Sequence, residues 1–330
     1  MESSALMNAS TPKAVVGDIG GTNARFAIAD LSTPSAPRIS DVAHLPSADY
    51  PSLEAALADY LAGLRTRPPV AVLAVAGPVD NGEAVLTNLS WHVRSSALAA
   101  LGFAAVSVIN DFRALAAAAD ALQESDLERI GPHLSPPKDA TIALVGAGTG
   151  FGAAALVREP GKTIALAGEG GHIGFSPEDD EEDAILRVLR ARFGRISIER
   201  IVSGPGLVNL YAALADIHGE ANDLDDPHAI LAAAAQKQHL ATRAVERFAG
   251  IFGAAAGDVA LTFGARGGVL LAGGLSEAML GILKAGSFRR RFEGKGRLAH
   301  FVRAVPTHMI KREDAALLGS ARLAEALHPR

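Results

Sequence analysis

Two glycine-rich turns are the clearest candidates for chemistry in this sequence. Each follows a short apolar run and combines glycines with a threonine. The residues concerned are Asp18, Gly20, Gly21, Thr22 and Asn23 in the first turn, and Gly148, Thr149 and Gly150 in the second. Glycine lets backbone N–H groups surround an anion, and the threonine hydroxyls add donors. Together the two turns are suited to holding a triphosphate.

Two aspartates stand where an apolar run ends. Asp18 could hold Mg²⁺ beside a phosphate, directly or through water, or it could be a simple Asx-type turn residue. Asp111 follows Asn110 and precedes a helix-like segment at residues 114–122. There it could cap the helix, or it could act as a general base that takes a proton from an attacking hydroxyl.

Three further polar residues could bind a sugar. Glu169 and His172 flank two glycines, and Glu199 follows in a basic and apolar segment. Carboxylates and imidazole form directional hydrogen bonds to hydroxyl groups. The alternatives are a surface loop for Glu169 and His172, and a salt bridge to Arg195 or Arg200 for Glu199. A zinc site is disfavoured because the sequence has no H-E-x-x-H motif and 0 cysteines.

Gly273 and Gly274 follow an apolar run and open a predicted helix. The start of a helix is a suitable place for contact with adenosine or phosphate. Close packing of the backbone would explain these glycines equally well.

Two short segments resemble other nucleotide-binding motifs. Gly161-Lys162-Thr163 resembles the end of a P-loop, but Leu156 stands where that motif needs glycine. Residues 148–153 fit the G-x-G-x-x-A pattern of dinucleotide-binding enzymes, which requires a helix directly afterwards. A turn at residues 158–161 leaves too little room for that helix, so the oxidoreductase interpretation is disfavoured.

The predicted elements alternate between strands and helices, which indicates an α/β protein. A strand–turn–strand pattern occurs at residues 14–30 and again at 141–157, as expected for two lobes of similar plan. Further strands are predicted at 70–76, 105–109 and 269–272, and helices from Ser52 and from Ser176-Pro177 to Gly194. Residues 124–139 are expected to be a linker. The acidic run at 178–183 could bind a metal. The alternative is that these carboxylates form the first turn of a helix, where they interact favourably with the helix dipole.

Composition excludes several classes of protein. The 330 residues suit two domains, with 49% hydrophobic and 20% charged residues. A nucleic-acid binder is not expected, because the 31 basic residues are outnumbered by 36 acidic ones and aromatic residues make up only 5% of the chain. The absence of cysteine suits a reducing cytosol, and residues 1–11 lack the pattern of a secretion signal. No membrane span is expected, because alternate glycines interrupt the longest uncharged stretch, at 140–157.

Five motifs, taken in order, resemble the bacterial glucokinase family: VGDIGGTNAR at 16–25, INDF at 109–112, GAGTG at 146–150, GEGGH at 168–172 and SGPGLVNLY at 203–211. The resemblance implies a two-lobe, actin-like sugar-kinase and Hsp70-like ATPase fold with a duplicated ribonuclease H-like core and a cleft between the lobes. It implies a small lobe of residues 1–120 plus 313–330, completed by the last helix, and a large lobe of residues 121–312. It also implies a cytoplasmic homodimer.

The same resemblance implies ATP-dependent phosphorylation of D-glucose at O6. It implies that Asp111 is the general base and that glucose is bound by Asn110, Asp111, Glu169, His172 and Glu199. It gives phosphate contacts to both glycine turns, Mg²⁺ to Asp18, and the neighbourhood of adenosine to Gly273 and Gly274. A kinase for another hexose or amino sugar, and a catalytically weak sugar sensor, remain alternatives.

Overall fold

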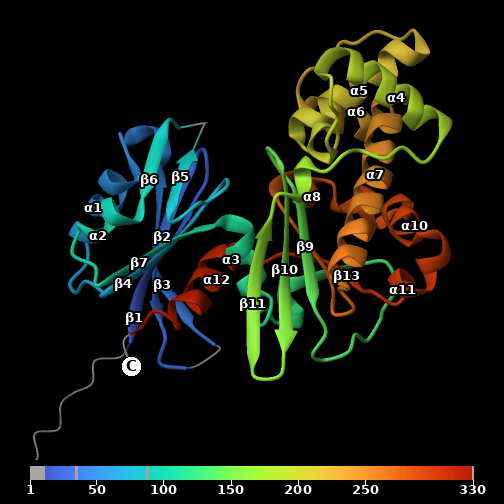
Figure 1. Cartoon of the computed structure of the whole chain (residues 1–330). Coiled ribbons are helices and arrows are strands. Elements are labelled where there is room, and N and C mark those ends of the chain that lie inside the picture. Colours follow the sequence, from blue (N-terminus) through green and yellow to red (C-terminus); the bar gives the residue numbers. More distant parts are fainter. Residues whose placement is uncertain (1–11, 34–35, 87–88, 329–330) are drawn as a thin grey trace, which may run out of the picture. The chain divides into compact units, whose positions relative to one another are not determined.

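The computed structural model describes residues 12–33, 36–86 and 89–328, so residues 1–11, where no secretion signal is expected, lie outside the described residues. The chain divides into two compact units (Figure 1). Unit 1 comprises Met1–Leu122 together with Glu313–Arg330, and unit 2 comprises Gln123–Arg312. Each unit has its own sheet and its own hydrophobic core.

Unit 1 is built on a mixed five-stranded sheet with the strand order β3-β2-β1-β4-β7. Strand β1 pairs antiparallel with β2 and parallel with β4, which in turn pairs parallel with β7. These strands are β1 (Lys13–Ile19), β2 (Asn23–Asp30), β3 (Arg38–Pro46), β4 (Val70–Val75) and β7 (Ala105–Asn110). A separate hairpin is formed by β5 (Glu83–Leu86) and β6 (Trp91–Arg94).

Helices cover both faces of this sheet. They are α1 (Leu53–Ala62), α2 (Ser95–Ala99), α3 (Asp111–Ala118) and α12 (Ala315–Ala324), with a 3-10 turn η1 at Ser47–Asp49. Successive residues of β1 point to opposite faces: Val15 belongs to the core that contains α1, whereas Val16 belongs to the core that contains α12. Burial on both faces explains why β1 and β4 are almost continuously apolar.

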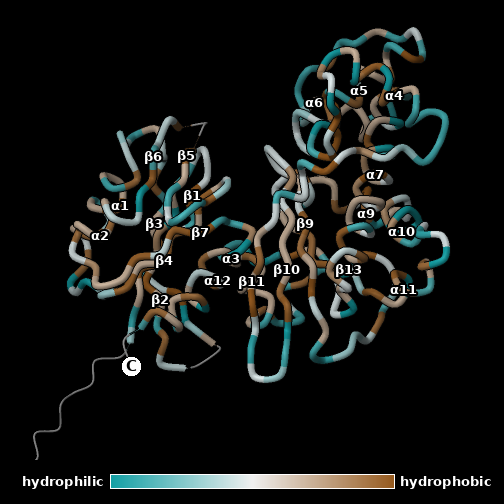
Figure 2. The backbone as a smooth tube through the Cα atoms, in the orientation of Figure 1, coloured by the Kyte–Doolittle hydropathy of each residue, from teal (hydrophilic) through white to brown (hydrophobic). Residues whose placement is uncertain are grey.

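Unit 2 has a six-stranded sheet with the order β11-β10-β9-β12-β13-β8. Its strands are β8 (Leu127–Ile130), β9 (Ile142–Ala147), β10 (Phe151–Glu159), β11 (Lys162–Gly168), β12 (Gly268–Ala272) and β13 (Thr307–Ile310). Strands β9, β12 and β13 are parallel to one another, as are β1, β4 and β7 of unit 1. Figure 2 shows hydrophobic residues along the central strands of each sheet and hydrophilic residues in many of the loops.

Unit 2 also carries most of the helices. The α-helices are α4 (Asp180–Phe193), α5 (Gly204–His218), α6 (Pro227–Ala235), α7 (His239–Phe263), α8 (Gly274–Ala278), α9 (Leu280–Lys284), α10 (Ser287–Glu293) and α11 (Ala299–Arg303). The 3-10 turns are η2 (Glu124–Asp126), η3 (Gly170–His172), η4 (Ile198–Arg200) and η5 (Gly296–Leu298). Helix α7 runs along the core of the unit, where Phe248 and Phe252 are fully buried. Within the described ranges, no helix has both the length and the apolar composition needed to cross a bilayer.

The α/β class and most of the predicted elements are confirmed. Helix α1 begins after Ser52, whose hydroxyl accepts a hydrogen bond from the Ala55 N–H at 3.3 Å. Helix α4, by contrast, begins at Asp180 and not at Ser176-Pro177, because the Asp179 carboxylate accepts from the Glu182 N–H at 2.9 Å and caps it there. Gly194 ends that helix as predicted.

One other expectation was wrong. The segment at 124–139 is not all linker, because β8 lies within it and pairs antiparallel with β13, where Ile130 is fully buried. The sequence argument against a dinucleotide-binding fingerprint at residues 148–153 is confirmed. The glycine turn leads directly into β10, which pairs antiparallel with β9, whereas a dinucleotide-binding fingerprint requires a helix at that point.

Candidate active site

The first glycine turn, residues 18–23, connects β1 to β2 in unit 1. The Gly20 N–H donates to the Asn23 carbonyl at 2.9 Å and closes the turn. The N–H groups of Gly21 and Thr22, both exposed, find no acceptor in the part of the chain that the structure describes. The turn lines a cavity of about 380 Å³, which is also lined by Arg25 and His44. Free N–H donors beside a guanidinium are suited to an anion.

Asp18 forms an ion pair with Arg25, a partner that the sequence analysis missed. The two residues lie directly opposite each other in the β1–β2 register, so the register of the predicted hairpin was the signal that could have found it. Arg25 also donates from Nη1 to the Glu313 carbonyl at 2.9 Å. The other oxygen of Asp18, Oδ1, has no partner among the described residues and remains able to bind a ligand.

Asn110 and Asp111 lie where β7 passes into α3. Asn110, and not Asp111, caps the helix: its Oδ1 accepts from the Arg113 N–H at 3.2 Å, and its Nδ2 donates to the Gly77 carbonyl at 3.0 Å. Asp111 is half-buried as the first helical residue, and its Oδ1 accepts from the Phe112 N–H at 2.9 Å. The interpretation of Asp111 as a plain N-cap is therefore wrong.

The sheet of unit 1 brings the first glycine turn and Asn110 to one edge. Ile19 pairs with Val75 on β4, and Val75 pairs with Asn110 on β7, so the three parallel strands end in the same row. Ligands of open α/β sheets bind beside the carboxyl ends of the strands. The position of Asp18, Asn110 and Asp111 at this edge follows from the topology.

The second glycine turn, residues 148–150, occupies the equivalent position in unit 2. The Gly148 N–H donates to the Gly150 carbonyl at 2.9 Å, and the Gly148 carbonyl accepts from the Gly204 N–H, at the start of α5, at 2.8 Å. The N–H groups of Thr149 and Gly150 are again without an acceptor among the described residues. Both turns thus present free backbone donors.

The Glu-His turn, residues 169–172, contains η3 and follows β11. The side chains of Glu169 and His172 are exposed and have no hydrogen-bond or ion-pair partner among the residues described. The backbone of the turn, in contrast, is held in place: the His172 carbonyl accepts from Arg195 Nη2 at 2.8 Å. Polar side chains that are open on a fixed backbone are suited to binding a polar ligand.

Glu199 lies in η4 and contacts the second glycine turn. Its Oε2 accepts from the Phe151 N–H at 2.8 Å. The expected alternative, a salt bridge, does not form: Arg195 binds the His172 carbonyl, and the Arg200 guanidinium stacks on the Phe193 ring at 4.4 Å from its centroid. Ser203 fixes the backbone here by donating to the Glu199 carbonyl at 2.7 Å.

Gly273 lies between the carboxyl end of β12 and the start of α8. The residue before it, Ala272, pairs with Gly146 of β9, so Gly273 lies near the end of β9 as well. Its φ of +94° is the left-handed region, and a Cβ there would lie 2.5 Å from the Ala147 carbonyl oxygen. Buried Ser276 accepts from the Ala147 N–H at 2.9 Å. Close packing therefore explains Gly273, while exposed Gly274 has no such contact.

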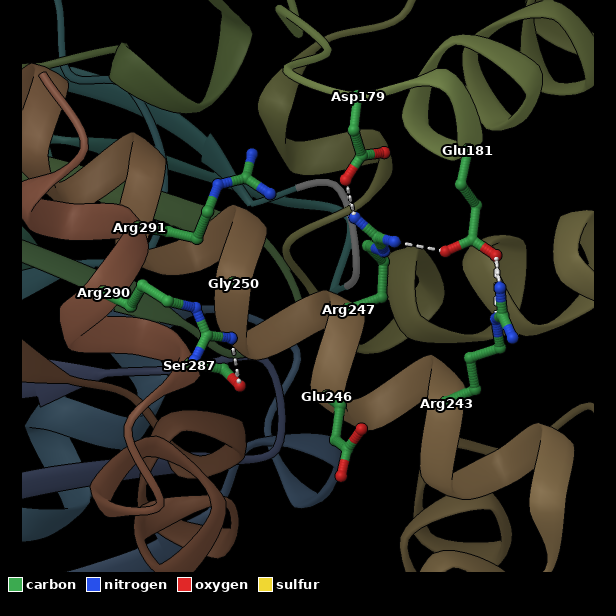
Figure 3. Close-up of a pocket in the computed structure, with 9 residues that line it drawn as sticks. All are labelled: Asp179, Glu181, Arg243, Glu246, Arg247, Gly250, Ser287, Arg290 and Arg291. Carbon is green, nitrogen blue, oxygen red and sulfur yellow. Dashed lines mark hydrogen bonds and ion pairs between the residues drawn. The ribbon is translucent and has the colours of Figure 1, made fainter. Parts of the chain in front are cut away.

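The acidic run at 178–183 does not form a metal site. Asp179, Glu181 and Glu182 pair with arginines of α7 and α10, as Figure 3 shows for Asp179 and Glu181. We call this set the arginine cluster: Asp179, Glu181, Glu182, Arg243, Arg247 and Arg291. Fully buried Glu182 accepts from Arg291 Nη1 at 2.6 Å and from Arg247 Nη1 at 3.2 Å. The arginine cluster is an ion-pair network that joins α4, α7 and α10.

Comparison with known proteins places the chain in a family. The family model described as Glucokinase matches residues 15–327. The chain belongs to the glucokinase family. It is 45% identical over 309 residues to the glucokinase of Caulobacter sp. (strain K31), which covers 93% of each chain, and 42% identical to that of Nitrobacter hamburgensis, which covers 94% of this chain and 96% of that one.

Solved structures agree with this assignment. A glucokinase from an Antarctic psychrotroph superposes with a TM-score of 0.86 at 35% identity, covering 96% of this chain and 99% of that one. A ROK family glucokinase from Streptomyces griseus, in complex with glucose and AMPPNP, has a TM-score of 0.62 at 20% identity, with 95% and 99% coverage. This second likeness shows the fold alone. The actin-like ATPase fold of sugar kinases, expected from the five motifs, is confirmed.

Proposed function

We propose that this glucokinase-family chain transfers the γ-phosphoryl group of ATP to O6 of D-glucose. The observation that carries the proposal is the state of the motif residues. Unsatisfied groups among the described residues are the side chains of Glu169 and His172 and the N–H groups of Gly21, Thr22, Thr149 and Gly150, although the backbone around them is fixed. Exposed, preorganised donors and acceptors of this kind are what a phosphate chain and a sugar require.

The two glycine turns bind the phosphates of ATP. Gly20, Gly21, Thr22 and Asn23 contribute from unit 1, and Gly148, Thr149 and Gly150 from unit 2. Gly273 and Gly274 lie near the adenosine. Backbone N–H groups stabilise the charge that develops on the transferred phosphoryl group without reorganising, which is the main source of catalysis in phosphoryl transfer.

Asp111 accepts the proton of the O6 hydroxyl as its oxygen attacks the γ-phosphorus. The O6–P bond forms, the bond from the γ-phosphorus to the β,γ-bridging oxygen breaks, and ADP leaves. Asn110, Glu169, His172 and Glu199 hold the other hydroxyls. A site built to pair each hydroxyl discriminates against a deoxy sugar, because the unpaired buried group costs about 1 to 3 kcal/mol.

Asp18 fits a role in holding Mg²⁺. Mg²⁺ sites on nucleotides commonly use one or two carboxylates together with phosphates and water. Oδ1 of Asp18 is available, while Arg25 holds the other oxygen and fixes the side chain. Bound there, Mg²⁺ supplies positive charge to the phosphates.

The resemblance supports three further parts of the proposal. The lobes are residues 1–120 with 313–330, which carry the first phosphate turn, and residues 121–312, which carry the second turn and the sugar and adenosine segments. The enzyme is a cytoplasmic homodimer. Its product, glucose 6-phosphate, enters glycolysis. Size-exclusion chromatography with light scattering tests the dimer.

The function is tested by ADP release from purified protein with MgATP and a panel of hexoses, beside Asp111→Ala and a blank without sugar. Glucose-dependent turnover that is lost in Asp111→Ala supports both the reaction and the base. Turnover that is faster with another hexose or an amino sugar would assign a different substrate. Tight sugar binding without turnover on any hexose would favour a sensor.

A further inference from the structure

The carboxylate of Glu199 lies against the second glycine turn, although 48 residues of sequence separate it from Phe151. Its Oε2 is held by the Phe151 N–H, and a Cβ added to Gly150 would lie 2.6 Å from the same oxygen. Its Oε1 has no partner among the described residues. One oxygen is therefore committed to the turn, and the other is free for a ligand.

The Glu-His turn packs on the same strand. Gly168 pairs with Ala153 in the β10–β11 register, and a Cβ on Gly171 would lie 2.3 Å from the Phe151 carbonyl oxygen. This contact is backbone against backbone, so it cannot yield as a flexible side chain would. The Glu-His turn is therefore packed tightly on the strand that follows the second glycine turn.

The start of α5 closes the same assembly. The hydroxyl of Ser203 holds the Glu199 carbonyl, while the N–H of the next residue, Gly204, holds the Gly148 carbonyl. Both sides of the Glu199–Phe151 contact are thus tied to a single helix end. A shift of the Glu199 carboxylate would therefore displace the backbone of the glycine turn.

We propose that Glu199 is a positioning residue that couples sugar binding to nucleotide binding. This inference rests on the proposed function, because it assumes that the sugar binds Oε1 of Glu199 and that a phosphate of the nucleotide binds the glycine turn. A sugar hydroxyl that binds Oε1 fixes the carboxylate, and the fixed carboxylate holds the Phe151 N–H and so the conformation of residues 148–150. By linkage, a bound nucleotide raises the affinity for sugar by the same factor.

Two glycines of one turn provide a matched pair of variants. Neither Gly148 nor Gly150 has a positive φ, so alanine is compatible with the backbone at both positions. A Cβ at Gly148 meets nothing within 4 Å, whereas a Cβ at Gly150 displaces Oε2 of Glu199. The displaced atom is the end of a flexible side chain, so we expect Gly150→Ala to fold.

The experiment is calorimetric titration with glucose, with and without a non-hydrolysable ATP analogue and Mg²⁺. In the wild-type protein the analogue should tighten glucose binding by about 5- to 150-fold, the usual range of coupling between sites. In Gly150→Ala that ratio should fall toward 1, and glucose binding without the analogue should weaken. In Gly148→Ala, which leaves the Glu199 carboxylate in place, glucose binding without the analogue should weaken less than in Gly150→Ala. Thermal unfolding checks that both variants are folded.

The outcomes separate this proposal from the proposed function. A wild-type ratio in Gly150→Ala, or a ratio of 1 in an active wild-type enzyme, overturns the coupling and leaves the kinase activity standing. A wild-type protein that neither binds glucose nor releases ADP in its presence overturns both.

A second measurement needs no variant at Gly150. Hydrogen exchange of the Phe151 amide should slow when glucose alone is added to the wild-type protein. The slowing should be lost in Glu199→Gln, because a neutral amide is a weaker acceptor than a carboxylate. An exchange rate that glucose does not change would leave Glu199 a purely structural residue and overturn the coupling.

Discussion

Two regions of unit 2 both contain carboxylates, but in opposite surroundings. In the arginine cluster every carboxylate is paired, and Glu182 is fully buried between Arg247 and Arg291. In the Glu-His turn, Glu169 and His172 are exposed and lack partners among the described residues. A cavity of about 430 Å³ lies beside the cluster, yet most of the arginines that line it are already bound to carboxylates. The densely packed charges of the arginine cluster therefore stabilise the fold, whereas the candidate site is recognised by unsatisfied polar groups on a fixed backbone.

The largest expected effect separates catalysis from stability in unit 1. Asp111→Asn should lower kcat by about 10² to 10⁴, the usual contribution of a general base, while glucose affinity stays within several-fold. Asn110 caps α3, so the helix should keep its start and the protein its stability. Steady-state ADP release gives kcat, and calorimetry gives the affinity. A variant with full turnover would refute the assigned base.

Glu182→Gln should have the opposite profile. Removing this charge leaves Arg247 and Arg291 partly uncompensated, and breaking a buried pair costs several kcal/mol. We expect a loss of about 3 kcal/mol, the lower end of that range, because Asp179 and Glu178 still pair with these arginines. Urea unfolding measures the loss, and kcat per folded molecule should not change.

Asp183→Asn is the matched control for that variant. It removes one charge from the same first turn of α4, but Asp183 is exposed and has no ion-pair partner among the described residues. Its loss should cost only about 0.5 kcal/mol through the helix dipole. Equal losses in the two variants would contradict the structural role of the cluster.

Glu169→Ala should weaken glucose binding without unfolding the protein. A hydrogen bond from a hydroxyl to a carboxylate contributes about 1.5 to 3 kcal/mol, so the Kd should rise by about 10- to 150-fold. The Tm should not change, because the side chain contacts no partner in the described chain. A variant that loses stability and keeps its affinity would place Glu169 with the cluster and not with the site.

Sequence patterns predicted the elements and candidates that depend on near neighbours. The Ser52 cap, the strands on either side of each glycine turn, and the end of α4 at Gly194 all follow from local propensity. The bond from Phe151 to Glu199 could not be predicted, because it joins residues 48 positions apart and depends on how η4 packs on β10. Strand β8 was missed for the same reason, since its pairing with β13 spans most of unit 2.

Acid should weaken the arginine cluster by protonating Glu181. Burial alone would raise the pKa of Glu181, but hydrogen bonds from Arg243 and His218 and the charge of Arg247 outweigh it and lower the pKa below 4.5. A lowered pKa in the folded state means that this stability is fully present above about pH 4.5, the ordinary value for glutamate, and is lost as the pH falls through the lowered value.

The check is the urea midpoint of the wild-type protein and of Glu181→Gln between pH 6 and about pH 3, since the window lies below the ordinary glutamate pKa. The wild-type midpoint should fall more steeply as the pH drops. Parallel curves for the two proteins would show that Glu181 does not contribute to acid stability.

The smallest effect is expected at the exposed edge of the cluster. Arg243 pairs with Glu181 but its side chain is 42% exposed, and water and salt screen such a pair. Arg243→Gln should therefore cost at most about 1 kcal/mol, and less at 1 M salt than at 0.1 M, because the Debye length shrinks from about 10 to about 3 Å. Unfolding at the two salt concentrations measures this difference, and Glu182→Gln in the same buffers is the comparison.

Since Glu182 is fully buried, the stability lost in Glu182→Gln should depend much less on salt. An equal salt dependence of the two variants would mean that burial does not divide the cluster into a core and an edge.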